Sequence, residues 1–155
     1  MPLFREMPKI EYSGYILTDI SQRYSIVKSI KNNNNIFQDY EIQDYEKAEH
    51  LAHDFYGSSD FVWLIYLMND IIDPFYGWIL NNGELTSFIT DKYGSGNEDN
   101  IHHYTLDEIE FSYNEPGSVP VTNTEYEDRI NESKRKIKVI RPDFTSQILN
   151  ELKNT

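Results

Sequence analysis

One short segment of the chain carries an unusual concentration of apolar and aromatic residues. Residues 55–78, FYGSSDFVWLIYLMNDIIDPFYGW, contain both tryptophans and eight aromatic residues in 24 positions. The longest apolar run in this segment, FVWLIYLM, has eight residues, whereas a membrane-spanning helix needs about 20. A membrane insert is therefore excluded. The segment predicts the core of a small domain, with some rings left exposed as contacts for a partner.

The pattern around this segment predicts the order strand, helix, helix, strand. Residues 36–42 are typical of a short strand, and the first helix is expected between a cap at Asp44 and an end at Gly57. Its buried positions have helical spacing: Ala48, Leu51, Ala52 and Phe55. A second helix, apolar nearly all round, is expected over residues 58–69. After a turn at Pro74, the remaining aromatic run is expected to be extended and to form the second strand.

The rest of the chain is divided into segments around this module, and the predicted fold class is α+β. Residues 1–37 are expected to be an arm with at most one helix, after Thr18, and residues 38–80 to be the module. Residues 81–124 are predicted to contain a helix, strands and a Pro- and Gly-rich connection, and residues 125–155 a helix–strand–helix arm. The module core is predicted to be formed by six residues of its two helices: Leu51, Ala52, Phe55, Trp63, Leu64 and Leu67.

The chain is strongly acidic, and its charge is unevenly distributed. It has 155 residues, a net charge of −12 and no cysteine. No disulfide or thiolate site can form, and the acidity argues against nucleic acid as a main partner, because phosphate binding relies on Lys and Arg. Five of the fourteen bases lie in KRKIKVIR, residues 134–141. These bases are expected either to pair with acidic neighbours or to be solvated surface charge.

No group of residues in the sequence predicts catalysis, a cofactor or a bound metal. His50 and His53 have a spacing that could ligate a metal, but they lie opposite the buried helix face and are expected to be solvated. His102 and His103 lie in an alternating strand, so their side chains are expected to point to opposite faces. With 26 acids in the chain, close carboxylate pairs arise by chance, and a carboxylate-based hydrolase is only a weak alternative. The N-terminus has charges where a signal peptide is apolar.

The module resembles a LysM domain, in which two helices joined at Tyr-Gly lie between two strands. The residues that carry this resemblance are Leu51, Ala52, Tyr56, Gly57, Trp63, Asn69, Asp73 and Pro74. A closer resemblance is to the LysM-bearing baseplate wedge protein 53 family of contractile-tailed bacteriophages. It rests on YGSSDFVWLIYLMNDIIDPFYGWIL and on the C-terminal INESKRKIKVIRPDFTSQILNEL.

This resemblance implies a structural protein of the virion's tail baseplate, with no enzymatic activity, cofactor or metal. It would dock on wedge-core and hub-proximal proteins and link neighbouring wedges, in six copies or a multiple, assembling in the host cytoplasm without nucleic acid or membrane. Apolar contacts are expected at Phe75, Tyr76 and Trp78. Charged contacts are expected at five bases: Lys134, Arg135, Lys136, Lys138 and Arg141. The alternative is a LysM-type module that binds peptidoglycan or N-acetylglucosamine polymers.

Overall fold

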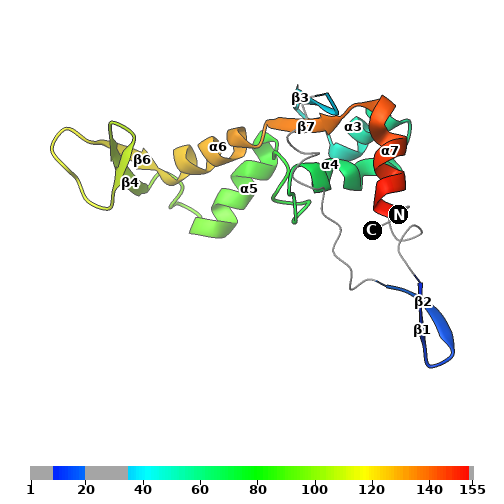
Figure 1. The fold of residues 1–155 in the computed structure, drawn as a ribbon. Coiled ribbons are helices and arrows are strands. Elements are labelled where there is room, and N and C mark those ends of the chain that lie inside the picture. The colour runs from blue at the N-terminus through cyan, green and yellow to red at the C-terminus, as the bar shows by residue number, and fades with distance from the viewer. Residues whose placement is uncertain (1–8, 20–34, 154–155) are drawn as a thin grey trace. The chain divides into compact units, whose positions relative to one another are not determined.

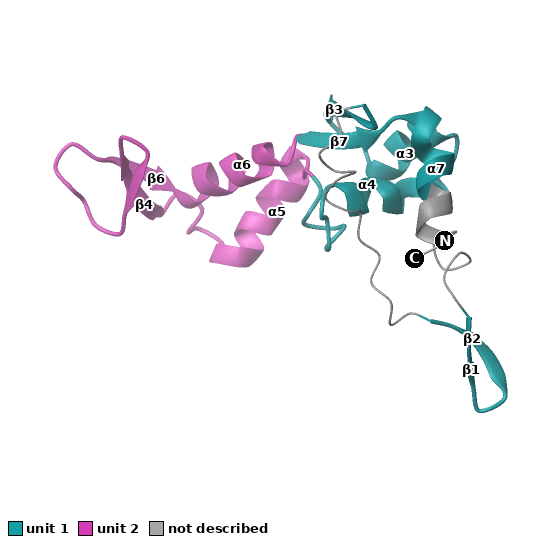
Figure 2. Ribbon diagram, viewed as in Figure 1, with its two compact units in different colours: residues 1–78, 136–155 teal, residues 79–135 magenta. Residues whose placement is uncertain are grey.

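The computed structural model describes residues 9–19 and 35–153 and contains both helices and strands (Figure 1). The expected α+β class is therefore confirmed. The chain forms two compact units: unit 1 contains residues 1–78 and 136–155, and unit 2 contains residues 79–135 (Figure 2). Unit 2 is thus inserted into the sequence of unit 1, which differs from the consecutive segments expected. The helix expected after Thr18 lies outside the described residues.

In its described residues, unit 1 combines two antiparallel sheets of two strands each with three helices. Its elements in chain order are β1 (Lys9–Tyr12), β2 (Tyr15–Thr18), β3 (Phe37–Glu41), α3 (Ala48–Tyr56), the 3-10 turn η1 (Ser59–Phe61), α4 (Val62–Met68), β7 (Lys136–Ile140) and α7 (Pro142–Lys153). β3 pairs with β7, and Asp39 lies opposite Lys138. The second strand of the module therefore comes from beyond unit 2. The prediction of a strand after Pro74 is wrong, because no strand lies between α4 and the start of unit 2.

The segment after α4 closes on itself instead of extending. The Asp73 carboxylate accepts a hydrogen bond from the Phe75 N–H at 2.9 Å, and the Gly77 N–H donates to the Asp73 carbonyl at 2.7 Å. A Cβ atom on Gly77 would lie only 2.4 Å from that carbonyl oxygen, so the tight turn requires glycine. The aromatic composition favoured a strand, but the Asp-Pro and Gly positions decide the local conformation.

Local signals place the ends of the first helix and the start of the next. Gly57 adopts a left-handed conformation at φ 75°, and its N–H donates to the His53 carbonyl at 2.8 Å, which ends α3 as expected. The Ser58 hydroxyl then caps η1 by accepting from the Asp60 N–H at 3.2 Å. The expected start at Asp44 is wrong: α3 begins at Ala48. The Glu46 carboxylate instead binds the Gln43 N–H in the preceding turn.

The core of unit 1 joins both strands to α4 and α7. Its buried members are Phe37, Trp63, Leu64, Met68, Ile140 and Ile148. Of the residues predicted to form the module core, four are buried: Leu51, Ala52, Trp63 and Leu64. Phe55 and Leu67 are half-buried, because Leu67 packs at the margin of this cluster and Phe55 packs edge-to-face against Tyr40.

The Asn69 side chain connects the end of α4 to the outer edge of β7. Its Nδ2 donates to the Ile65 carbonyl at 2.8 Å and to the Lys138 carbonyl at 2.9 Å. Its Oδ1 accepts from the Lys138 N–H at 2.8 Å. The amide therefore pairs with Lys138 as a neighbouring strand would, and it closes that edge of the sheet.

Unit 2 consists of two helices and a three-stranded antiparallel sheet in the order β5-β4-β6. The elements are α5 (Asn82–Tyr93), β4 (Ile101–Leu106), β5 (Ile109–Phe111), β6 (Val119–Thr122) and α6 (Asn123–Ser133). Capping boxes start both helices, at Asn81 with Glu84 and at Thr122 with Glu125. β6 lies in the segment expected to be only a connection. This edge strand accommodates Pro120, because an edge position does not need every N–H in the ladder.

A buried carboxylate holds α6 to α5 in unit 2. Glu127 is almost fully buried, and its Oε1 accepts from the Lys92 ammonium at 2.6 Å and from the Tyr93 hydroxyl at 2.7 Å. Asn131, one turn further along α6, accepts from the Leu80 N–H at 2.9 Å and donates to the Leu80 carbonyl at 2.8 Å. Both contacts tie α6 to the first part of unit 2.

Replacing Asn69 by Ala should destabilise unit 1 by about 2–4 kcal/mol, because three hydrogen bonds are lost and main-chain groups of Lys138 lose their partner. Both tryptophans, Trp63 and Trp78, lie in unit 1. Urea unfolding followed by tryptophan fluorescence therefore reports on unit 1. The exposed His50→Ala serves as the control and should change the stability by less than about 0.5 kcal/mol. A similarly small effect of Asn69→Ala would contradict the role assigned to this amide.

Unit 2 should lose stability in acid through Glu127. Burial acts to raise the pKa of this carboxyl, but hydrogen bonds from Lys92 and Tyr93 outweigh it and the pKa lies below the usual 4.5. A carboxyl with a lowered folded pKa stabilises the fold above its unfolded pKa, and this contribution disappears as the pH falls through the folded value. Hydrogen exchange in α5 and α6, corrected for intrinsic rates, should show falling protection below about pH 4.5.

Glu127→Gln isolates this contribution. It should cost about 1–3 kcal/mol at pH 7, a range kept low because the Lys92 partner is half exposed to solvent. In acid, hydrogen-exchange protection of α5 and α6 should also fall less in the Glu127→Gln variant than in the original chain. Asp128→Asn, at the next and exposed position of α6, is the matched control. Identical acid profiles for Glu127→Gln and the original chain would rule out this role for Glu127.

Candidate interaction surfaces

The N-terminal hairpin has one fully apolar face. β1 and β2 pair with Ile10 opposite Leu17 and Tyr12 opposite Tyr15, so these four side chains lie on the same face. All four are exposed, from 44% for Ile10 to 71% for Tyr15. An isolated two-stranded hairpin is at best marginally stable in water. This face is therefore a candidate contact surface.

This hairpin was not expected from the sequence, although a signal for it exists. The tetrads KIEY and YILT alternate in polarity only in part, but they are separated by the two residues Ser13 and Gly14. Both residues have positive φ, at 53° and 81°, as the commonest two-residue hairpin turn requires. The Ser13-Gly14 pair was the signal for a hairpin turn, but residues 1–37 were expected to be an irregular arm.

A second apolar surface lies on the loop that follows α4. Ile72 is 96% exposed, Phe75 81% and Tyr76 55%, so the two rings expected as contacts are exposed. Trp78 is not: it is only 5% exposed. Its indole N–H donates to the Glu46 carbonyl at 2.9 Å, and its ring packs edge-to-face on Tyr66. Trp78 therefore anchors the loop, and its expected role as an exposed contact is corrected.

The five bases expected to form one charged contact are divided between the units. Lys134 and Arg135 belong to unit 2, whereas Lys136, Lys138 and Arg141 belong to unit 1. Arg135 makes a two-pronged ion pair with Glu132, at 2.7 and 2.8 Å. Desolvation lowers the pKa of Lys134, which is half-buried. Lys136 and Arg141 are exposed. The basic segment is thus no single patch within either unit.

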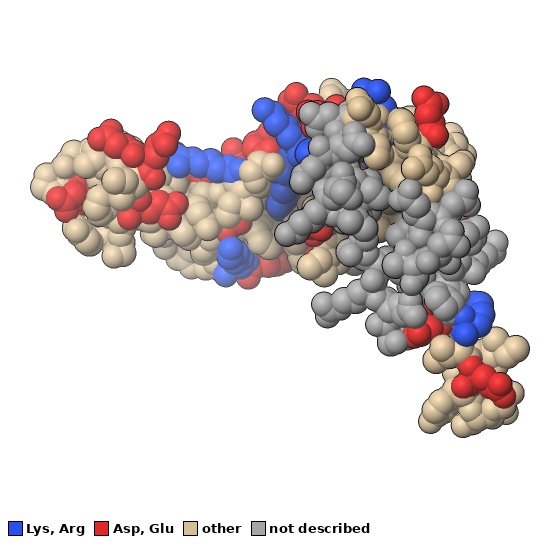
Figure 3. Space-filling model, viewed as in Figure 1, with Lys and Arg blue, Asp and Glu red and all other residues tan. Residues whose placement is uncertain are grey.

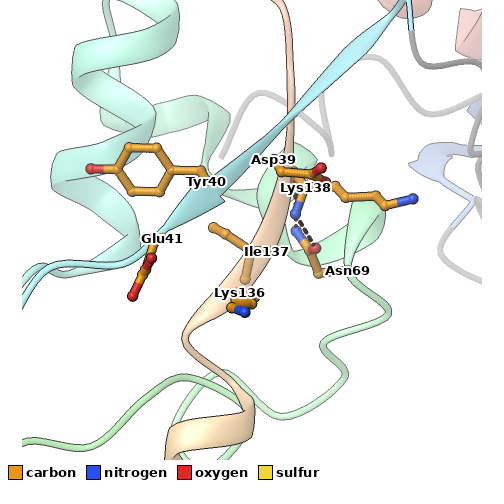
Figure 4. Close-up of a pocket in the computed structure, with 7 residues that line it drawn as sticks. All are labelled: Asp39, Tyr40, Glu41, Asn69, Lys136, Ile137 and Lys138. Atoms are coloured by element: carbon orange, nitrogen blue, oxygen red, sulfur yellow. Dashed lines mark hydrogen bonds between the residues drawn. The ribbon is translucent and has the colours of Figure 1, made fainter.

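A hollow of about 670 Å³ lies beside the β3–β7 pair. It is lined by Asp39, Tyr40, Glu41, Asn69, Lys136, Ile137 and Lys138, which come from both strands and the end of α4 (Figure 4). The Lys138 ammonium lies 4.2 Å from the centre of the Phe37 ring, a favourable cation–π distance. Burial, with the neighbouring Glu46, raises the pKa of Tyr40 to about 12, so its hydroxyl stays protonated and donates to that carboxylate at 2.9 Å.

The surface of unit 2 is mainly acidic. Unit 2 contains twelve Asp and Glu residues against four Lys and Arg residues. Figure 3 shows acidic side chains gathered over its three-stranded sheet. This surface favours basic partners and repels acidic ones.

His102 and His103 do not point to opposite faces as expected. Their Nδ1 atoms lie 2.9 Å apart, and the His102 ring stacks on Tyr126 with the ring centres 3.8 Å apart. A register irregularity between Ile101 and His103 interrupts the alternation of β4, so consecutive side chains share a side. His50 and His53 are exposed. Within residues 9–19 and 35–153, no three His, Cys, Asp or Glu residues are arranged to hold a metal.

The fold and these surfaces define a small α+β protein with exposed apolar faces on a hairpin and a loop. None of the helices in the described ranges is both long and apolar enough to cross a membrane. The family model of base plate wedge protein 53 matches residues 3–115, which is most of the chain. The chain therefore belongs to the base plate wedge protein 53 family, as the sequence resemblance indicated.

The chain also matches a protein of Enterobacteria phage T4, the baseplate wedge protein gp53. The two are 31% identical over 75 residues. This match covers 48% of the present chain and 38% of the T4 protein. The matched part of the chain therefore spans well under half the length of this curated relative.

Phe75 and Trp78 should differ sharply when each is replaced by Ala. Phe75→Ala should change the stability of unit 1 by less than about 0.5 kcal/mol, because the ring is exposed. Trp78→Ala should cost about 3–5 kcal/mol, because a buried ring and its hydrogen bond are lost. Urea unfolding followed by Trp63 fluorescence and circular dichroism measures both variants. Equal losses would show that Phe75 is a packing residue and not a free contact.

Proposed function

We propose that this protein is a non-enzymatic structural component of a phage tail baseplate. The observation that carries the proposal is the family match over residues 3–115. It is supported by two exposed apolar surfaces, on the β1–β2 hairpin and on the loop after α4, which are the kind of surface that a larger assembly covers. The proposed location is the virion's tail baseplate, with assembly in the host cytoplasm.

The hairpin is the first proposed contact with a baseplate neighbour. Its apolar face gains stability only when another surface covers it, since a two-stranded hairpin has little core of its own. Tyr12 and Tyr15 are the largest side chains on this face, and tyrosine is enriched among residues that dominate binding energy. We assign the covering surface to a wedge or hub-proximal protein.

The loop after α4 is the second proposed contact. Phe75 and Tyr76 present exposed rings, while the buried Trp78 holds the loop in place. Two separate apolar surfaces on one chain can engage two neighbours, which supports a role in linking adjacent wedges. Lys136, Lys138 and Arg141 remain proposed charged contacts for acidic neighbours, and six copies or a multiple are proposed for the assembly.

The order β3, α3, α4, β7 supports a LysM-like module whose second strand follows an insertion. This order also favours the alternative function, which is binding of N-acetylglucosamine polymers. The hollow beside β3 and β7 favours it less. Charged side chains line much of that hollow, and the Asn69 amide is already engaged by main-chain groups. Protein docking is therefore the function that the surfaces support best.

Co-expression of the full chain with the other small proteins encoded beside it tests this proposal. The original chain should elute in a large complex of fixed ratio, measured by size-exclusion chromatography with light scattering. Tyr12→Ser combined with Tyr15→Ser should weaken binding at least about tenfold, because two large apolar anchors are removed. Ile109→Ser, at an exposed apolar position of unit 2, is the matched control and should assemble normally.

Two outcomes would contradict this proposal. A chain that stays monomeric beside all of these proteins and binds N-acetylglucosamine oligomers would overturn the proposal in favour of the glycan-binding alternative. Loss of assembly in the Ile109→Ser control as well would show that general apolar character, and not the hairpin face, drives association.

A further inference from the structure

The two outer edges of the β3–β7 sheet differ in whether a side chain is hydrogen-bonded to their main-chain groups. Among residues 9–19 and 35–153, this sheet has the two strands β3 and β7. On the β7 side, the Asn69 amide occupies both the N–H and the carbonyl of Lys138. On the β3 side, no equivalent side chain from the described residues is bonded to the Asp39 main chain. An edge strand with unoccupied main-chain groups is a template for another strand.

The hydrogen-bond pattern identifies which β3 groups face outward. Because Asn69 bonds the Lys138 main chain from outside, Lys138 and the opposite Asp39 form a non-hydrogen-bonded pair of the ladder. The Arg141 N–H donates to the Ile36 carbonyl at 2.8 Å, which fits the same alternation. The N–H and carbonyl of Asp39 and the N–H of Glu41 therefore point away from β7. The Glu41 carbonyl accepts from the Gln43 side chain at 2.8 Å.

The side chains along this edge define the partner that fits it. Asp39 and Glu41 are two residues apart, so they lie on the same face of the sheet, and both are exposed. A strand added beside β3 would place its own residues directly next to them. Opposite charges at such cross-strand positions are favourable and like charges are unfavourable. Two copies of β3 would therefore repel each other at this edge.

We propose that the outer edge of β3 binds an extended segment of a partner protein with Lys or Arg at alternate positions, which adds a third strand. The Asp39 main chain provides hydrogen bonds, and the Asp39 and Glu41 carboxylates select the basic side chains. This inference names the chemistry of one partner segment and rests on the proposed protein-docking function. It excludes an acidic strand and a second copy of β3 as occupants.

Two labelled peptides test the edge with the full chain. The first has lysine at alternate positions separated by valine and threonine, and the second has glutamate in place of each lysine. Fluorescence anisotropy should show binding of the lysine peptide and at least tenfold weaker binding of the glutamate peptide. Asp39→Asn combined with Glu41→Gln should abolish most of this preference. Asp91→Asn combined with Asp128→Asn makes the same change of charge at exposed positions of unit 2 and should leave it unchanged.

A proline variant separates strand addition from simple charge attraction. Asp39→Pro removes an outward N–H, which an edge strand tolerates, so the chain should fold and lose binding of the lysine peptide. Gln38→Pro is the contrast, because its N–H faces β7 and its loss should destabilise unit 1 in tryptophan-fluorescence unfolding. No binding to the original chain, or equal binding to a folded Asp39→Pro variant, would overturn the inference.

The failure of this inference and the failure of the proposed function have different signatures. Baseplate proteins that still assemble with the Asp39→Pro variant, although it no longer binds the lysine peptide, would refute the edge as a partner site and leave the docking function intact. Failure of the original chain to assemble with any of these proteins would count against the docking function itself.

Discussion

The pairing of the Asn69 amide with the Lys138 main chain is the interaction on which unit 1 most depends. A carboxamide has both a donor and an acceptor, so it can match the N–H and carbonyl of one strand residue. Here it fixes the end of α4 against a strand that lies far along the sequence. β7 is the partner strand of β3, and it brings Val139 and Ile140 to fully buried positions. The order strand, helix, helix, strand is therefore completed by a distant segment.

A similar contact explains how a whole unit can be inserted between α4 and β7. In unit 2, the Asn131 amide pairs with the N–H and carbonyl of Leu80, which holds the beginning of this unit beside its last helix. An insertion whose two ends are held together disturbs its host little. Lengthening a connection also costs little in itself, because the entropy of loop closure rises only slowly with length. Unit 2 can then carry its own buried network around Glu127 without competing for the core of unit 1.

The sequence allowed the local elements to be predicted better than their partners. Gly57 ends α3 as expected, and helices were expected where α5 and α6 lie, because caps and glycines act within a few residues. β7 was expected as a strand, but its pairing with β3 depends on the tertiary fold and cannot be predicted from a local pattern. The aromatic run after Pro74 shows the reverse error. Its composition favoured a strand, whereas the turn around Asp73 and Gly77 fixed its conformation.

For the candidate surfaces too, local features could be predicted from the sequence, whereas features that depend on the tertiary fold could not. The exposure of Phe75 and the burial of Trp78 could not be separated by sequence, because the two rings are close neighbours and only the fold places the Glu46 carbonyl beside the indole. The basic segment is continuous in sequence, yet the boundary between the units falls within it. The hairpin was predictable in principle from Ser13 and Gly14. It was missed because an apolar face of four residues is too short to stand out from an irregular arm.

The two kinds of surface differ in how well they resist unwanted association. On the β3 edge, Asp39 and Glu41 prevent identical edges from pairing, so free copies of the chain are protected there. The apolar hairpin face has no charge on it, and two free copies could bury these faces against each other. The net charge of −12 opposes such contacts at long range, but salt screens exposed charges beyond about 8–10 Å. The proposed docking therefore favours covering of the hairpin early in assembly, whereas the charged β3 edge is under no such constraint.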